Sequence, residues 1–292
     1  MLTKKKLILL LSPFTIFFCF VFVSAFIKSI VTSLGYYPLM GLKTLTFKYY
    51  MTALQDKTFL TTSLRTFCFA LLSAGLACLG GLALALVLQR STGPVGRFGF
   101  KLAQLPVMLP HIFVILALLQ LLSQTGLVPS LLVHLGWLKG PQHFPLLVND
   151  PLQIGIILTY LWKEIPFVIV SLMLVLRSLD RRYSAVGQNL GASKLQIFWH
   201  ISLPMIQPAL LNAFIINFSF NFGAYEVPYL LGNPRRELLP VYIYDFYVQG
   251  DLTQMPLIMS LNILLSLFAV LCAGAVLYLS RRLPGGHLGG LK

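Results

Sequence analysis

Long apolar runs dominate the chain and are separated by shorter polar segments. A hydrocarbon layer about 30 Å thick requires roughly 20 helical residues at 1.5 Å each, and six runs reach that length. Because backbone groups in lipid have to hydrogen-bond within their own segment, each run is expected to be a helix. The pattern therefore predicts an all-α integral membrane protein with six transmembrane helices. The predicted spans are Leu7 to Ile27, Thr66 to Leu88, Leu102 to Leu122, Pro151 to Leu176, Met205 to Phe222, and Met255 to Leu279.

Composition excludes the soluble classes of protein. Of the 292 residues, 57% are hydrophobic and only 10% are charged, whereas a soluble domain carries about 25% charged residues. The four cysteines lie inside apolar runs, and none forms a C-x-x-C pair. They are interpreted as small hydrophobic residues rather than as disulfides or metal ligands.

The net charge of +14 is explained by membrane topology. With both termini inside, the cytoplasmic segments hold one acid, Asp180, while the outer segments hold six of the eight acids beside eight basic residues. By the positive-inside rule both termini are expected in the cytoplasm, near anionic membrane lipid. No nucleic-acid partner is expected. The basic residues of the inner segments are Lys4, Lys5, Lys6, Arg90, Arg97, Lys101, Arg177, Arg181, Arg182, Lys194, Arg281, Arg282 and Lys292.

Two inner connections differ in character. Residues 89–101 are expected to be a tight basic turn, in which Gly93, Pro94, Gly96 and Gly99 break any helix. Residues 177–204 form a longer loop of helix-forming composition, and a simple connector does not need that length. In the second span, Gly75, Gly80 and Gly81 favour close contact between helices.

The long inner loop predicts a helix-turn-helix on the membrane surface. Residues 184–190 are expected to form a short helix that ends at Gly191, a residue that adopts positive φ. Ser193 is the expected N-cap of a second helix. Leu195, Phe198 and Trp199 are expected to supply the apolar face of that helix. The alternative is an amphipathic helix that serves only as a membrane anchor.

This loop resembles the cytoplasmic EAA loop of permease subunits in binding-protein-dependent ABC importers. The family pattern is EAA, three residues, Gly, nine residues, and Ile-x-Leu-Pro. With Gly191 as the anchor, Ile201, Leu203 and Pro204 match, whereas the EAA positions hold no glutamate. The resemblance implies that the loop couples the permease to an ATPase. The residues that it implicates are Ser184, Ala185, Val186, Gly187, Leu190, Gly191, Ala192, Ser193, Ile201, Leu203 and Pro204.

The resemblance covers roughly residues 58–282. The segment FGAYEVPYLLG, at 222–232, is similar to permeases for polyamines, thiamine and ferric iron. The resemblance implies a type I ABC importer permease fold in the bacterial inner membrane, with a second permease, two ATP-binding subunits and an external solute-binding protein as partners. It implies no cofactor on this chain and no enzymatic activity of its own, and the chain lacks a G-x-x-x-x-G-K-[ST] phosphate loop. The implied division is an N-terminal helix and outer segment at 1–57, a permease domain at 58–282 and a tail at 283–292.

Polar residues inside the predicted spans are candidates for the solute path, because such residues are costly in lipid. Lys163 and Glu164 are neighbours in the fourth span, where they could neutralise each other, either at the path or against another helix. Four acids in the outer segment at 226–251 favour a cationic solute such as a polyamine, although two arginines share that segment. The candidate path residues are Asn217, Asn221, Tyr225, Glu226 and Glu164.

The sequence is also compared with two alternative functions, a secondary transporter and a membrane-embedded enzyme. An ion-gradient-driven secondary transporter predicts an internal repeat with broken helices in both halves, and the sequence shows no such repeat. A membrane-embedded enzyme needs clustered acidic, histidine or nucleophilic residues at the membrane surface. The inner face offers a single acid for that purpose, Asp180.

Overall fold

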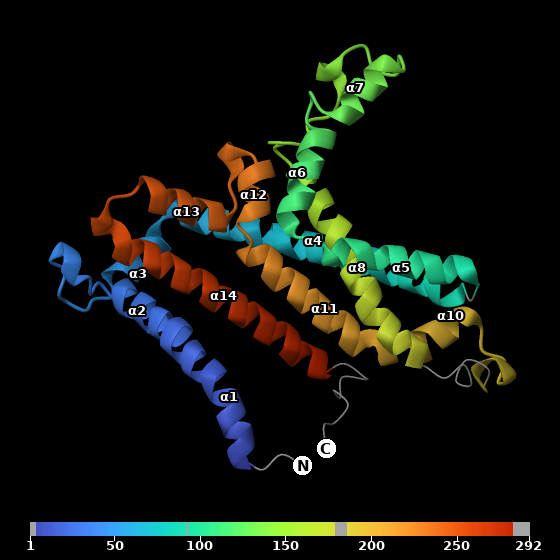
Figure 1. Cartoon of the computed structure of the whole chain (residues 1–292), viewed down its shortest axis with the longest axis horizontal. Coiled ribbons are helices and arrows are strands. Elements are labelled where there is room, and N and C mark those ends of the chain that lie inside the picture. Colours follow the sequence, from blue (N-terminus) through green and yellow to red (C-terminus); the bar gives the residue numbers. More distant parts are fainter. Residues whose placement is uncertain (1–3, 92, 179–185, 283–292) are drawn as a thin grey trace. The chain divides into compact units, whose positions relative to one another are not determined.

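The computed structural model describes residues 4–91, 93–178 and 186–282. Within these ranges the ordered elements are helices, apart from one isolated bridge between Tyr37 and Leu42 (Figure 1). The elements are α1 (Lys4–Phe18), η1 (Cys19–Val23), α2 (Ser24–Ser33), η2 (Pro38–Met40), α3 (Lys48–Gln55), α4 (Lys57–Arg90), α5 (Pro94–Met108), α6 (His111–Leu122), α7 (Leu127–His134), η3 (Pro141–His143), α8 (Ile154–Ser178), α10 (Lys194–Ile197), η4 (Phe198–Ser202), α11 (Leu203–Gly223), α12 (Glu226–Leu231), η5 (Pro234–Arg236), α13 (Leu239–Gln249), η6 (Leu252–Gln254) and α14 (Met255–Arg282).

Within the described residues, six helical segments are long and apolar enough to cross a membrane, which confirms the number predicted from hydropathy. Five of them overlap the predicted spans for most of their length. An even number of crossings is consistent with both termini lying on one side. The six segments are Leu9–Ser33, Lys57–Arg90, His111–His134, Ile154–Arg177, Lys194–Gly223 and Leu252–Tyr278.

The third span begins later than predicted, and the inner turn before it is helical. Leu109 is extended, with φ −81° and ψ 135°, because the ring of Pro110 disfavours the α conformation in the residue before it. Residues 102–108 therefore belong to α5, a separate helix. The prediction that Gly96 and Gly99 break the helix is wrong, since both lie inside α5.

The two glycines of α5 instead allow this helix to pack closely against the end of α4 and the residue after it. A Cβ at Gly96 would collide with the carbonyl oxygen of Ser91, and a Cβ at Gly99 would lie 3.1 Å from Cδ2 of Leu88. Leu88 lies in the last turn of α4, and Ser91 directly follows that helix. The absence of side chains at these two positions lets α5 fold back beside that end.

The chain forms two compact units. The first comprises Met1–Thr61 and Tyr242–Phe268, and the second comprises Thr62–Val241 and Ala269–Lys292. In the first unit, the Tyr242 hydroxyl donates a hydrogen bond of 2.9 Å to Oδ2 of Asp56. The candidate functional residues lie in the second unit.

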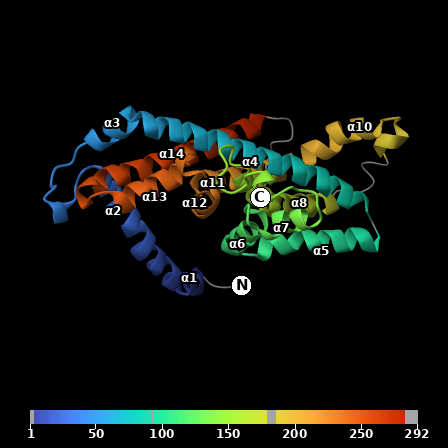
Figure 2. The ribbon, with the colours of Figure 1, turned by 90° about the horizontal axis from the view of Figure 1, so that it is seen from above.

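The core of the second unit is built where α8 packs against α5 and α11, as both views show (Figures 1 and 2). Its buried residues include Leu172 and Ile206. α4 approaches α8 at two of the three glycines predicted to favour helix contact, Gly80 and Gly81, whereas the prediction is wrong for Gly75, where a Cβ would meet nothing within 4 Å. A Cβ at Gly80 would lie 3.0 Å from Cδ1 of Ile165, and a Cβ at Gly81 would lie 2.5 Å from the side chain of Val168.

This close approach predicts a graded response to alanine. Gly81→Ala forces the Val168 side chain and the α8 backbone to move, so we expect a loss of about 1–3 kcal/mol in stability from overpacking. Gly75→Ala is the matched control, since a Cβ there meets nothing within 4 Å. The measurement is the thermal unfolding of both purified variants in detergent. An equal melting temperature for the two would contradict the packing described.

Candidate functional site

The inner loop contains a closed turn centred on Gly191. Residues 186–189 are helical, and Gly191 has a φ of +82°. The Gly191 N–H donates to the Gln188 carbonyl at 2.9 Å, and the Ala192 N–H donates to the Gly187 carbonyl at 2.9 Å. These two bonds form a Schellman motif, which satisfies the last carbonyls of the short helix. The predicted helix end is confirmed for the described residues, while Ser184 and Ala185 lie outside them.

The second helix begins directly after this turn, as the N-cap prediction requires. The Ser193 hydroxyl accepts from the Gln196 N–H at 3.3 Å, and the Gln196 side chain accepts from the Ser193 N–H at 2.8 Å. This reciprocal pair is a capping box. Sequence reasoning found Ser193 but missed Gln196, although the S-x-x-Q spacing is the signature of that motif.

The two short helices contact each other through Gly187. A Cβ at Gly187 would lie 3.1 Å from Cγ1 of Ile197 and 3.5 Å from Cδ1 of Ile201. Ile197 is buried, whereas Leu195 and Trp199 are exposed. Ile197 of α10 and Ile201 of η4, rather than the predicted apolar residues, therefore make the contact with the preceding helix.

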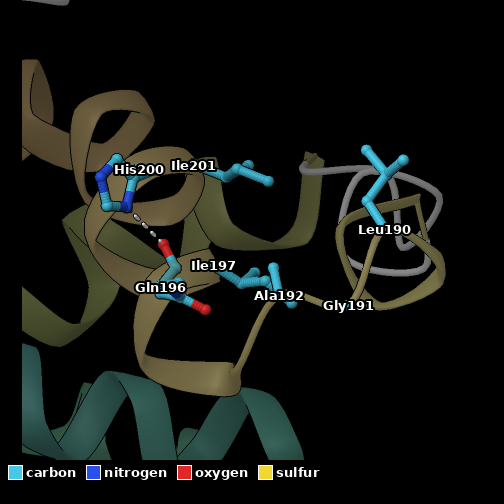
Figure 3. A pocket seen from close by; sticks show the side chains of 7 residues that line it. All are labelled: Leu190, Gly191, Ala192, Gln196, Ile197, His200 and Ile201. Carbon is cyan, nitrogen blue, oxygen red and sulfur yellow. Dashed lines mark hydrogen bonds between the residues drawn. The ribbon is translucent and has the colours of Figure 1, made fainter.

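An open pocket of about 330 Å³ lies beside the turn (Figure 3). Figure 3 shows Leu190 on one side of it and the side chains of α10 and η4 on the other. The exposed fraction of Leu190 is 82%. The pocket is lined by Leu190, Gly191, Ala192, Gln196, Ile197, His200 and Ile201.

The second helix continues into the membrane span. α10, η4 and α11 follow one another without a gap, and η4 is a π-helical turn. Pro204 has no N–H and its ring displaces the carbonyl four residues earlier, and the wider turn of η4 accommodates this ring. Leu203 packs against the core of the second unit. The surface turn is thus continuous with the helix that carries Asn217 and Asn221.

The capping box predicts a local change in hydrogen exchange. Ser193→Ala removes the acceptor for the Gln196 N–H, a change that costs about 1 kcal/mol at an N-cap. We expect faster exchange of the amides of α10, measured by mass spectrometry. Ser202→Ala is the control, because Ser202 makes no side-chain cap. Unchanged exchange in Ser193→Ala would show that the cap does not hold the turn.

A second group of candidate residues gathers between α8 and α11. Glu164 is 5% exposed, Asn217 is 4% exposed and Asn221 is fully buried. The Asn221 amide lies within reach of the Glu164 carboxylate, although no hydrogen bond of regular geometry joins them. Asn217 lies one turn earlier on the same face of α11.

Tyr160 completes this group, and sequence reasoning missed it. Tyr160 is fully buried, and its ring lies 6.2 Å from that of Phe220 in an edge-on arrangement. It precedes Glu164 by four residues, and this i, i+4 spacing on α8 was the available signal. We call Tyr160, Glu164, Asn217 and Asn221 the buried polar cluster.

Lys163 does not neutralise Glu164. Among the described residues, Lys163 Nζ lies 2.9 Å from Nδ1 of His111 at the start of α6, and no ion pair joins it to Glu164. Adjacent residues on a helix point about 100° apart, which explains why the two charges separate. The His111 ring also stacks on Phe220 at 4.8 Å.

The remaining path candidates belong to the segment after α11, where Glu226 lies near enough to Tyr160 and Lys163 to interact with them electrostatically. Glu226 is exposed at the start of α12, and the partly exposed Tyr225 ring stacks on Tyr229 at 4.9 Å. Of the five predicted path residues, the structure therefore brings three together inside the helices and leaves two at the segment after α11. Within the described residues, no group of three His, Cys, Asp or Glu side chains is placed to hold a metal ion.

Three permease proteins are similar in sequence to this chain over stretches of different length. It is 28% identical over 208 residues to the probable sulfate transport system permease protein cysT of Marchantia polymorpha, covering 70% of this chain and 69% of the relative. It is 25% identical over 237 residues to the molybdenum transport system permease protein ModB of Mycobacterium tuberculosis, covering 81% and 83%. A shorter stretch of 128 residues is 27% identical to the spermidine/putrescine transport system permease protein PotC of Escherichia coli, covering 44% and 47%.

A solved structure shows the same fold. A chain of the bacterial alginate ABC transporter, crystallised in complex with an alginate pentasaccharide-bound periplasmic protein, aligns with a TM-score of 0.78 at 21% identity over 94% of both chains. Residues 77–283 match the family described as the binding-protein-dependent transport system inner membrane component. Since this match spans well over half of the chain, the protein belongs to that family of ABC importer permeases, multi-pass proteins of the inner membrane.

Proposed function

We propose that residues 186–201 are the surface on which a separate ATP-hydrolysing subunit docks, and that movement of this surface drives the solute path open and closed. The chain is a permease subunit of a binding-protein-dependent importer, so ATP hydrolysis belongs to a partner subunit. The observation that carries the proposal is the turn at Gly191. It is closed by two backbone bonds and a capping box, and it continues through α10 and η4 into α11.

The proposed complex contains a second permease, two ATP-binding subunits and an external solute-binding protein. The alginate transporter was crystallised together with a periplasmic protein that carries the alginate pentasaccharide. By analogy, the external protein would deliver a small solute to this chain. The family assignment disfavours the rival mechanism driven by an ion gradient, because members of this family depend on a binding protein.

Docking by shape explains how the loop could act without the family glutamate. No Asp or Glu occurs between Arg181 and Pro204, and Lys194 is the one formal charge in residues 186–204. The exposed side chains that flank the turn include Val186 and Leu190. We propose that these side chains and the pocket beside them make apolar contact with the ATPase.

The docking proposal predicts that the backbone at Gly191 controls coupling. Gly191→Val places a β-branched residue at φ +82°, at a cost of order 1–3 kcal/mol. We expect solute uptake to fall strongly while ATP hydrolysis continues. The measurement is the number of ATP molecules hydrolysed per solute transported in proteoliposomes that contain the complete transporter.

Gly191→Asn is the matched control for this variant. Asn tolerates the left-handed region, and a Cβ at position 191 meets nothing within 4 Å. Asn is therefore expected to retain most of the coupling. Normal coupling in Gly191→Val would favour the alternative in which the loop is only a membrane anchor.

The class of solute is a further proposal. The names of the relatives divide between sulfate and molybdenum on the one hand and the organic cations spermidine and putrescine on the other. The acids of the outer segment favour a small cationic, polyamine-like solute for this chain. Glu226 and Tyr225 are proposed as path residues at its outer side.

A further inference from the structure

We propose that the buried polar cluster binds the cationic group of the transported solute, an organic ammonium ion, with Glu164 as its counter-ion. The inference rests on the proposed transport function and specifies the chemistry of the solute. It concerns Tyr160 and Glu164 on α8 together with Asn217 and Asn221 on α11.

Glu164 is a buried carboxylate with no cationic partner among the described residues, although the Asn221 amide lies within its reach. In the described part of the chain, neither of its oxygens has a hydrogen-bond partner, and its exposed fraction is 5%. It lies ten residues after Ile154, or about 15 Å along the helix at 1.5 Å per residue. That depth is near the middle of the hydrocarbon layer. A carboxylate there is costly unless it is paired.

The nearby cation of the chain is already engaged. Lys163 Nζ contacts His111 Nδ1 at 2.9 Å, and the helix turns Lys163 about 100° away from Glu164. The missing partner of Glu164 is therefore expected to come from outside the chain. A positively charged solute group supplies it.

Two other oxygens of the cluster match an ammonium group, while the amide nitrogens of Asn217 and Asn221, which also lack hydrogen-bond partners in the described structure, are donors. Oδ1 of Asn221 and the hydroxyl oxygen of Tyr160 also lack hydrogen-bond partners in the described structure, and both atoms are acceptors. An ammonium group donates up to three hydrogen bonds, and these two oxygens together with the carboxylate provide acceptors for them. An anionic solute would instead meet the negative charge of Glu164.

Access to the cluster requires movement. All four side chains are at most 5% exposed, so a solute reaches them only when α8 and α11 separate. α11 is the helix that continues from α10 and η4. The same helix therefore links the proposed docking surface to the proposed ammonium site.

Uptake by the complete transporter tests this inference. Radiolabelled spermidine and radiolabelled sulfate are supplied separately to cells that express the permease with its ATPase and binding protein. The wild type is expected to take up spermidine. Glu164→Gln keeps the shape and removes the charge, so the initial rate should fall roughly ten- to a hundredfold, the loss expected for a charge-assisted hydrogen bond. Glu164→Asp, which restores the carboxylate, should recover part of the rate.

Thr159→Val is the matched control on the same helix. Thr159 is equally buried, but its hydroxyl already donates to the Gly155 carbonyl at 2.8 Å, so uptake should remain at the wild-type rate. Quantitative blots of membranes confirm that each variant inserts. A wild type that takes up sulfate and not spermidine, or neither, overturns the inference. So does a Glu164→Gln variant with the wild-type rate, because Glu164 would then be a neutral structural residue.

Failure of the docking proposal gives a different result. In that case Gly191→Val transports and couples normally, while Glu164→Gln still loses uptake. The two hypotheses are therefore separated by the same set of variants.

Discussion

Lipid offers no water to backbone N–H and C=O groups, and this constraint determines the rest of the structure. It keeps the chain helical wherever it crosses the membrane, so the informative positions are those where a helix stops. Pro110 separates α5 from α6, and Gly191 reverses the chain between two short helices. At Gly191 the carbonyls of Gly187 and Gln188 accept the Schellman bonds, and the capping box provides acceptors for the N–H groups of Ser193 and Gln196. A turn closed in this way moves as one piece, which is the property that a docking element needs.

The same constraint separates two kinds of buried polar side chain. The hydroxyls of Thr66, Thr159 and Ser171 each donate to the carbonyl four residues earlier in their own helix, at 2.8 to 2.9 Å. These residues fit into an apolar core without needing anything else. The side chains of Glu164 and Asn221 make no such hydrogen bond within their own helices in the described structure. Side chains that a helix cannot satisfy are those expected to interact with a solute.

Features that depend on many residues or on adjacent residues could be predicted from the sequence. Each membrane span sums hydropathy over about twenty positions, and the turn at Gly191 depends on residues next to one another. Contacts between distant segments could not be predicted in this way. The sequence alone predicts that Gly96 breaks a helix, whereas the structure shows that its lack of a side chain makes room for the carbonyl of Ser91. The partner of Lys163 is His111, which is 52 residues away in the sequence.

Crosslinking at Leu190 tests most directly whether this loop is the point of coupling. A single cysteine at this exposed position, in the otherwise cysteine-free complete transporter in native membranes, is expected to crosslink to the ATP-hydrolysing subunit with a yield that changes when ATP is added. A cysteine at Leu152, which is 71% exposed before α8 on the expected outer side, should give no such product. Absence of any ATPase crosslink from position 190, with the transporter active, would contradict the account.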